Sequence, residues 1–422
     1  MRKNYLAGRE GGDNLDIIKA VGREADRRQI PAYLVGGIVR DIILQRKNGD
    51  IDIVVKADAL SFAREVAKTL KAEAKVYGQF GTATLELPGA GRLDIATARK
   101  EWYPHSGSLP KVCPGTLQDD LYRRDFTINA MAVSLNKDSF GELIDEFGGM
   151  ADLKKKKVRV LHDRSFLDDP TRILRAVRFE QRFGFRIESR TLRLLKEAMD
   201  DDGMRNVKPP RYFAEFKKML SESDPLPCLK RLNDLEGLRF MDSRMRLDIP
   251  FLKKIHGNWN LLKEKFPFYS QCPAWLIYFM AVVEPMEGPR LDAVLNKFPL
   301  RKDEKQSILQ VQKKGDLTRR LSAPRLTRSR VCGILRPLSP AAIAYWRAGT
   351  PSRRIEKRLD AYAGRDALIR LEINGDDLKR MGASSGRGIG MTLSRVLEMK
   401  IDRQRMSRKE ELDAARTLMR QG

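Results

Sequence analysis

The spacing of apolar residues divides the chain into two parts near residue 187. Before it, short apolar runs of strand length lie between segments with helical spacing. These patterns predict strands at 33–35, 50–55, 74–77, 82–87 and 92–96, and helices at 14–29 and 61–70. From Ile187 to Gly422 the apolar positions keep helical spacing almost throughout. We therefore expect an N-terminal region of strands and helices, followed by a helical remainder.

A glycine pair follows the first predicted strand. Gly36 and Gly37 lack a Cβ, so the backbone can turn tightly there and come close to a ligand. Residues 39–45 then have helical character, and the free N–H groups at the start of a helix suit a triphosphate. Arg40 adds a guanidinium whose planar fork matches phosphate oxygens. This stretch predicts a site for nucleotide phosphates.

Two carboxylates begin the next predicted strand. Asp50 and Asp52 are two residues apart, so their side chains leave the same face of the strand. The two charges repel each other unless a divalent ion lies between them, and carboxylate oxygens suit Mg²⁺. Alone, a glycine pair usually forms only a turn, and an Asp-x-Asp pair usually ends a strand in solvent. The order of glycines, Arg40 and carboxylates along the chain favours a catalytic site.

The charge balance points to a polyanionic partner. The 422 residues include 81 Lys and Arg against 56 Asp and Glu, which gives a formal net charge of +25. Residues 301–422 hold 29 basic and 14 acidic residues, a net of +15. We expect this part of the chain to follow a nucleic-acid backbone. The alternative is a basic surface that only faces solvent.

Other classes of function find little support in the composition. The four cysteines are scattered without CxxC spacing, and there are three histidines, so neither a zinc site nor a disulfide framework is expected. No apolar run approaches the roughly 20 residues that span a bilayer. Residues 1–16 lack the apolar core of a signal peptide. We expect a cytoplasmic protein without membrane contact, and the oligomeric state stays open.

Several motifs together resemble a known family. Leu34-Val-Gly-Gly-Ile-Val-Arg-Asp41 and the carboxylates after it resemble the nucleotidyltransferase superfamily of DNA polymerase β. Within that superfamily they resemble the class II tRNA nucleotidyltransferases and bacterial poly(A) polymerases. Residues 123–130, Arg-Arg-Asp-Phe-Thr-Ile-Asn-Ala, are similar to the second signature of that family, and 167–184 to its nucleobase-reading segment. The motifs cover roughly residues 30–185, with weaker similarity to the end of the chain.

The resemblance implies an α+β fold with a polymerase β-like head, built on a small mixed sheet with helices, and an all-helical neck, body and tail. The expected bounds are 1–150 for the head, 151–225 for the neck, 226–340 for the body and 341–422 for a basic, tRNA-binding tail. Asp50 and Asp52 would hold two Mg²⁺ ions. Asp94 is the candidate for a third catalytic carboxylate, although a hydrogen bond at the end of a strand would explain it equally well.

Residues 97–120 are expected to form a long loop, because they contain three prolines and two glycines. Their position matches a flexible loop of the family that helps to reshape the nucleotide pocket. Beyond the loop, the resemblance implies that Arg124 contacts the incoming nucleotide. The other residues expected to bind or support the nucleotide are Gly36, Gly37, Arg40, Asp41, Asp125, Asn129, Arg175 and Arg178.

Asp169 and Arg172 are expected to select the base. A carboxylate accepts a hydrogen bond from an exocyclic amine, and an arginine donates to a ring nitrogen. Cytosine and adenine offer this pair of groups on their pairing edges, whereas guanine and uracil offer a ring N–H and an oxygen. The expected substrates are therefore CTP and ATP. Asp169 and Pro170 also fit the cap and first position of a helix.

The implied activity is template-independent transfer of C, A or both to the 3′ end of tRNA, with release of pyrophosphate. The long segment at 97–120 favours addition of the terminal A, with complete CCA addition ahead of A-only addition. Two alternatives stay open: a poly(A) polymerase with the same head, and a non-catalytic RNA-binding relative. The presence of Asp50, Asp52 and Arg124 counts against the second.

Overall fold

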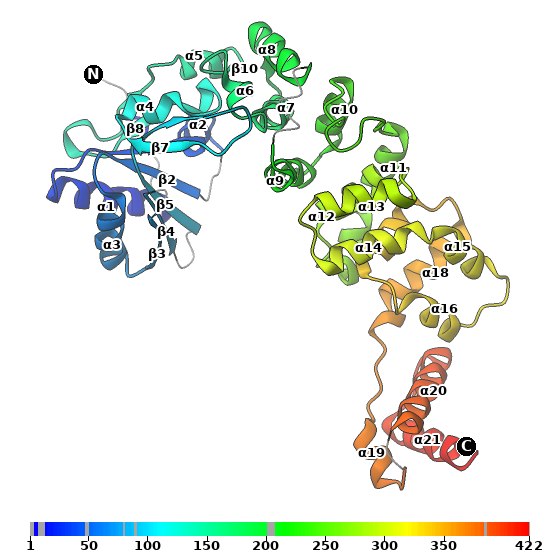
Figure 1. Ribbon diagram of the computed structural model, residues 1–422. Coiled ribbons are helices and arrows are strands. Elements are labelled where there is room, and N and C mark those ends of the chain that lie inside the picture. The colour runs from blue at the N-terminus through cyan, green and yellow to red at the C-terminus, as the bar shows by residue number, and fades with distance from the viewer. Residues whose placement is uncertain are drawn as a thin grey trace. The chain divides into compact units, whose positions relative to one another are not determined.

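The chain forms two compact units. The computed structural model describes residues 4–6, 13–46, 50–78, 81–87, 91–200, 207–383 and 386–421. The first unit comprises Met1–Glu215 with Asp234–Phe240, and the second comprises Phe216–Asn233 with Met241–Gly422. The strands of the large sheet all belong to the first unit, and helices make up the second (Figure 1). The predicted α+β fold with a helical C-terminal part is confirmed.

A seven-stranded mixed sheet lies at the centre of the first unit, in the order β3-β4-β5-β2-β1-β8-β9. β2 and β5 run parallel, and the other neighbouring strands are antiparallel. The strands are β1 (Ala32–Val35), β2 (Asp50–Val55), β3 (Glu73–Tyr77), β4 (Thr82–Leu87), β5 (Gly91–Thr97), β8 (Ala132–Ser134) and β9 (Leu143–Ile144). The short helix α2 (Gly37–Ile43) connects β1 to β2.

The two faces of this sheet differ in what covers them. On one face α1 (Asp13–Arg27) and α3 (Ala59–Leu70) close a core that includes Leu34, Ile53 and Ile95 (Figure 1). On the other face Leu121 of α4 (Leu117–Tyr122) packs against apolar residues of β1, β2 and β8. Because side chains alternate along a strand, Asp50 and Asp52 share this second face with Val54. The carboxylates thus lie beside the apolar cover, where the face opens.

The segment 97–120 is not a long loop, which corrects the expectation from its prolines and glycines. β6 (Arg99–Trp102) and β7 (Lys111–Pro114) form an antiparallel hairpin, and α4 follows at once. Pro104, Gly107 and Pro110 all fall in the connection between the two strands, where they interrupt no ladder hydrogen bond. Gly115 is needed for close packing, since a Cβ there would lie 2.7 Å from the backbone nitrogen of Lys100.

The rest of the first unit is mainly helical. α5 (Gly149–Lys154) and α6 (Ser165–Asp168) precede α7 (Arg172–Phe183), and α8 (Ser189–Asp200) and α9 (Pro209–Leu220) follow it; β10 (Lys157–Val158) and β11 (Arg186–Ile187) form a short parallel pair. α7 begins two residues later than expected, after Thr171. The reason is that the carboxylate of Asp169 accepts from the N–H and hydroxyl of Thr171 and holds this segment outside the helix.

The second unit contains the end of α9, all of α10 but its last residue, and the helices from α11 to α21. From α10 on, the helices are α10 (Leu226–Asp234), α11 (Ile249–Lys265), α12 (Ala274–Val283), α13 (Gly288–Lys297), α14 (Lys302–Gln312), α15 (Lys314–Ser322), α16 (Arg328–Leu335), α17 (Pro340–Gly349), α18 (Arg353–Gly364), α19 (Gly375–Arg380), α20 (Arg387–Arg403) and α21 (Arg408–Gln421). The last three close a separate small core around Leu378, Val396 and Ala415.

Within the described residues, no helix combines the length and apolar character needed to cross a bilayer. The predicted four-segment division of the chain stays a prediction.

Candidate active site

The turn between β1 and α2 brings three predicted site residues together. Gly36 has φ 79° and ψ −139°, a conformation that residues with a side chain rarely adopt. A Cβ on Gly36 would lie 2.7 Å from Nη1 of Arg124 and 3.6 Å from Oδ2 of Asp52. Glycine at position 36 therefore serves both the turn and the close approach of these two side chains. Gly37 begins α2, with the guanidinium of Arg40 next to it.

The three candidate carboxylates lie on two neighbouring strands. Asp52 on β2 is directly opposite Asp94 on β5, and Asp50 is opposite Arg92. Burial raises the pKa of Asp52, and the charges of Asp94 and Asp50 raise it further, against the opposing effect of Arg124. The side chain of Asp50 is exposed, whereas that of Asp52 is partly buried. A divalent cation here would offset the mutual repulsion of these carboxylates.

Asp94 is already held by its neighbours. The hydroxyl of Thr84 on β4 donates to Oδ1 of Asp94 over 2.6 Å, and Nη2 of Arg92 lies 2.6 Å from Oδ2. Among the described residues, no group of three or more Asp, Glu, His or Cys side chains is gathered closely enough to hold a metal ion. A cation on Asp50 and Asp52 would therefore need further ligands from substrate oxygens or water, as is usual for Mg²⁺.

Arg124 is held from α4 by a buried carboxylate. Asp120 is fully buried and accepts from Nη2 of Arg124 and from Nε and Nη2 of Arg123, at 2.7–3.0 Å. Burial alone would raise the pKa of Asp120, but Arg124 and Arg123 outweigh it and lower the pKa. Nε of Arg124 is buried without a hydrogen-bond partner in the described part of the chain. Asp120 thus holds Nη2 of Arg124, while Nη1 faces the glycine turn.

An open pocket of about 480 Å³ lies on the uncovered part of the sheet. Its walls come from six strands, β1 to β6, together with the two arginines that follow α4. The polar lining residues are Asp52, Tyr77, Thr82, Thr84, Arg92, Asp94, Arg99, Arg123 and Arg124. Arg99 and Arg123 both bind Glu101 of the hairpin at 2.8–3.0 Å. The pocket therefore places cationic groups beside the carboxylates of Asp52 and Asp94.

Sequence patterns had missed several of these residues. Asp120, Glu101, Thr84 and Tyr77 reach the site only because the hairpin, α4 and the outer strands fold over or beside β2. One signal was available: Thr82 and Thr84 alternate along a strand next to the one with Asp94, so they share its face. A second signal was the spacing of Asp120, because Arg123 and Arg124 follow it by three and four residues, the separation of ion pairs along a helix.

Five other predicted residues form a buried polar network. Nε and Nη2 of Arg40 bind the carboxylate of Asp41, and Nη1 donates to Oδ1 of Asn129 over 2.6 Å. Nδ2 of Asn129 donates to Oδ1 of Asp125, and Nε of Arg175 donates to Oδ2 of Asp125. Burial would raise the pKa of Asp125, but Arg175 and Asn129 outweigh it and lower the pKa to about 2.

This network lies behind the pocket rather than in it. Arg40 is buried against the rings of Phe179 and Phe183, with its guanidinium carbon 5.3 and 4.5 Å from their centroids. Arg175 and Arg178 both lie 3.6 Å from Glu215 of α9. Within the described chain, none of these arginines lines the pocket. Their contact with a triphosphate stays a prediction, while their observed contacts tie α2 to α7.

The two residues expected to select the base lie near the hairpin. Arg172 donates to the hydroxyl of Ser165 over 2.6 Å and to the carbonyl of Arg123 over 2.7 Å. Asp169 lies 3.0 Å from Nη2 of Arg211, whose Nη1 donates to the carbonyls of Gly107 and Ser108. Burial raises the pKa of Tyr103 at the end of β6, against the positive charge of Arg172. Asp169 and Arg172 are thus gathered at one place, with their polar atoms turned to protein groups.

Comparisons with known proteins agree on one relationship. Residues 32–159 match the family model "Poly A polymerase head domain", and 184–241 match "Probable RNA and SrmB- binding site of polymerase A". An A-adding tRNA nucleotidyltransferase of Geobacter sulfurreducens is 33% identical over 411 residues, which are 94% of this chain and 46% of that protein. The chain spans about half or less of the length of the curated relatives with the strongest matches.

Two solved structures match nearly the whole chain. The apo form II of a CCA-adding enzyme is 35% identical, with a TM-score of 0.78 over 97% of this chain and 98% of that one. The CCA-adding enzyme of Thermotoga maritima, solved in complex with tRNA, is 34% identical, with a TM-score of 0.72 over 99% of both chains.

Proposed function

Because the chain belongs to the class II tRNA nucleotidyltransferase and bacterial poly(A) polymerase family, we propose that it transfers nucleoside monophosphates from ATP or CTP to the 3′-hydroxyl of tRNA. Each transfer releases pyrophosphate. The observation that carries the proposal is the approach of Asp52 and Arg124 to the Gly36 turn. A carboxylate for a metal ion and a guanidinium for phosphate oxygens meet there at one strand end, as nucleotidyl transfer requires.

Asp50 and Asp52 are the proposed Mg²⁺ ligands. They offer hard oxygen donors on one strand face. Burial raises the pKa of Asp52, and the charges of Asp94 and Asp50 add to this effect. When bound, Mg²⁺ lowers the pKa of the attacking hydroxyl and neutralises charge on the triphosphate. Asp94, opposite Asp52, is the proposed third carboxylate, and Thr84 and Arg92 orient it.

Arg124 is the proposed phosphate-binding residue. Asp120 fixes one of its terminal nitrogens and leaves the other directed at Gly36. A fixed cation costs little reorganisation when charge develops on the leaving pyrophosphate, which is the usual basis of electrostatic catalysis. The buried network of Arg40, Asn129 and Asp125 has a supporting role in this proposal, because it holds the helix that begins at Gly37.

Asp169 and Arg172 are the proposed base-selecting residues. To face a base, Arg172 would exchange its bonds to Ser165 and to the carbonyl of Arg123 for a ring nitrogen of cytosine or adenine. Asp169 would accept from the exocyclic amine while Arg211 holds it in place.

Addition of the terminal A is the activity that we propose first. The full-length likeness to CCA-adding structures supports complete CCA addition, whereas the Geobacter relative is named for adding A. The test uses two tRNA transcripts, one without CCA and one ending in CC, each incubated with a single NTP and Mg²⁺. AMP incorporation on the CC-ending transcript is the expected result, and its absence would overturn the proposal.

The same experiment separates the remaining candidates. CMP incorporation on the shorter transcript would establish complete CCA addition, and its absence together with AMP addition would establish A-only addition. The family model named for poly A polymerase keeps a second candidate open. Long homopolymeric A tails on either transcript would decide for that activity.

A further inference from the structure

The pocket on the uncovered sheet face has two chemically different ends. Across the sheet, the order of strands places β1 and β2 at one end and β4 and β3 at the other, with β5 between them. The first end holds Asp52 and Arg124 beside the Gly36 turn. The second end holds the side chains of Tyr77, Thr82 and Thr84, which are uncharged. Asp94 on β5 lies between the two ends.

Nucleotidyl transfer needs two such ends. The attacking oxygen and the leaving oxygen lie roughly in line on opposite sides of the phosphorus atom. The proposed function places the triphosphate at the end with Arg124. The attacking hydroxyl must then approach from the direction of Asp94 and Thr84, and the nucleoside that carries it must extend toward β4 and β3.

We propose that Tyr77, Thr82 and Thr84 bind the 3′-terminal nucleoside of the acceptor RNA, with the ring of Tyr77 stacked on its base. Tyr77 on β3 is directly opposite Thr82 on β4, so their side chains share the face that carries Asp94. Tyr77 is 51% exposed and lines the pocket. This inference rests on the proposed function, because it names the second substrate's site in the same pocket.

The chemistry of this end suits an acceptor whose last base changes. In complete CCA addition the acceptor ends first in a base that differs between tRNAs, and then in C before the second and third transfers. Stacking on an aromatic ring tolerates every base, since each base has a π-face, whereas hydrogen bonds to a base edge would favour one. Thr84 is also bonded to Asp94, so a ribose seated against the threonines would lie next to the proposed third carboxylate.

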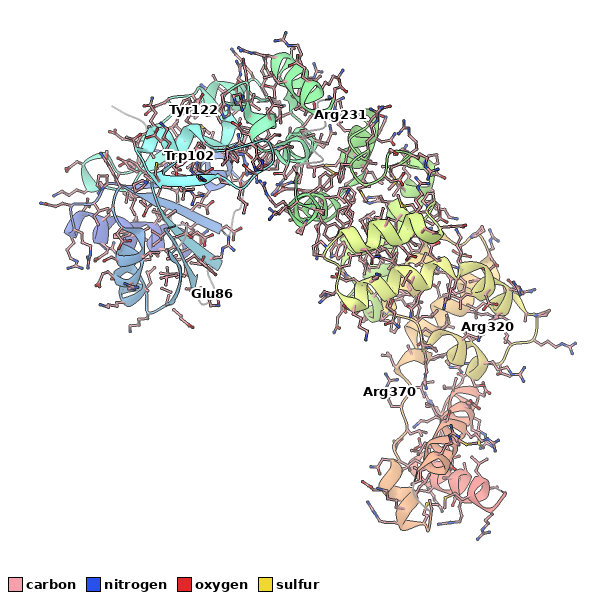
Figure 2. The ribbon with its side chains drawn as sticks, in the orientation of Figure 1. Glu86, Trp102, Tyr122, Arg231, Arg320 and Arg370 are labelled. Carbon is pink, nitrogen blue, oxygen red and sulfur yellow. The ribbon has the colours of Figure 1, made fainter. Side chains whose placement is uncertain are left out.

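The test compares Tyr77→Ala, Tyr77→Phe and Tyr122→Ala. Tyr122 is a matched control, because it belongs to the same unit, is 46% exposed and does not line the pocket among the described residues (Figure 2). Loss of one stacked base should reduce kcat/KM for a CC-ending tRNA roughly 5- to 150-fold in Tyr77→Ala. ATP affinity, measured by equilibrium dialysis, should not change. Tyr77→Phe should restore the rate.

A binding measurement keeps the inference separate from catalysis. With 2-aminopurine at the 3′ end of the tRNA, binding should quench its fluorescence in the wild type, in Tyr77→Phe and in Tyr122→Ala, but not in Tyr77→Ala. Unchanged quenching and an unchanged kcat/KM in Tyr77→Ala would overturn the inference while AMP addition by the wild type still stands. A wild type that adds no AMP would instead contradict the proposed function.

Discussion

Asp52 differs from the other carboxylates of its sheet face in what surrounds it. It is partly buried, lies opposite Asp94 and approaches the glycine turn, so its charge is opposed by Arg124 and repelled by two acids. Glu86, on the same face of β4, is solvent-exposed and paired with Lys75 at 2.6 Å. The two carboxylates therefore give a matched comparison between a site residue and a surface residue.

Asp52→Asn should reduce AMP transfer at least about 100-fold, because it removes the charge of a proposed oxygen ligand for Mg²⁺. tRNA affinity should stay within about twofold of the wild type, since the change is confined to the pocket. Glu86→Gln, at the exposed residue labelled in Figure 2, should leave the rate unchanged. Single-turnover kinetics and filter binding measure both quantities. Near-normal transfer by Asp52→Asn with Mg²⁺ would contradict its assignment as a ligand.

Arg172→Ala should relax discrimination against UTP and GTP by roughly 5- to 150-fold, because the guanidinium proposed to read the ring nitrogen is lost. The ratio of kcat/KM for ATP to that for UTP measures the effect. A variant that is slower with every nucleotide but equally selective would show that base selection depends on other residues. Arg172 also bonds the carbonyl of Arg123, so a thermal unfolding curve is the necessary control.

At the scale of elements, the sequence predicted those strands and turns that depend on neighbouring residues. It did not predict an element that depends on pairing between distant residues. The strand with Asp50 and Asp52 and the glycine turn before it were predicted from alternation and from the absence of Cβ. The hairpin of β6 and β7 was missed, because its prolines and Gly107 were counted as loop signals across the whole of 97–120. Their position in a short connection between two strands depends on the pairing partner, which composition does not reveal.

Gly36→Ala tests the glycine turn. The change should lower the free energy of unfolding by about 1–3 kcal/mol through backbone strain, and it should also suppress AMP transfer, because the Cβ would displace Nη1 of Arg124. Gly148 is a suitable control: its φ is also positive, at 76°, but nothing lies within 4 Å of an added Cβ. Gly148→Ala should cost about 1 kcal/mol.

Chemical denaturation and single-turnover kinetics separate the two effects. Equal loss of activity in both variants would show that strain alone is responsible, and that the space beside Arg124 is not needed.

At the scale of the whole molecule, the basic charge is concentrated before the last three helices. Residues 301–370 hold 18 basic and 6 acidic residues, a net of +12, whereas 371–422 hold 11 and 8, a net of +3. The helices α19 to α21 have their own small core. The sequence predicted a basic C-terminal third, but which helices carry the excess only becomes clear with their bounds.

The salt dependence of tRNA affinity should therefore arise mainly from α14 to α18. Replacing four exposed arginines there with Gln, at positions 319, 320, 325 and 330, should flatten the log–log slope by up to about 3.6, at roughly 0.9 per duplex phosphate. Arg320 is labelled in Figure 2. Four exposed basic residues of the last helices, at positions 395, 403, 405 and 409, give the matched control. If only the substitutions at 395, 403, 405 and 409 flattened the salt dependence, the phosphate contacts would belong to the last helices and not to α14 to α18.

The buried contacts between α2 and α7 have a consequence for how one pocket could serve two bases. Arg40, Asn129 and Asp125 connect the helix after the glycine turn to Arg175, one helical turn beyond Arg172. Under the proposed function, these contacts would hold the phosphate-binding end and the base-reading end of the site at a fixed distance from each other. A pyrimidine and a purine differ in size, so the difference must be absorbed by a part that is fastened less firmly. We expect the connection between β6 and β7 to absorb this difference, because Arg211, the partner of Asp169, bonds it through two backbone carbonyls.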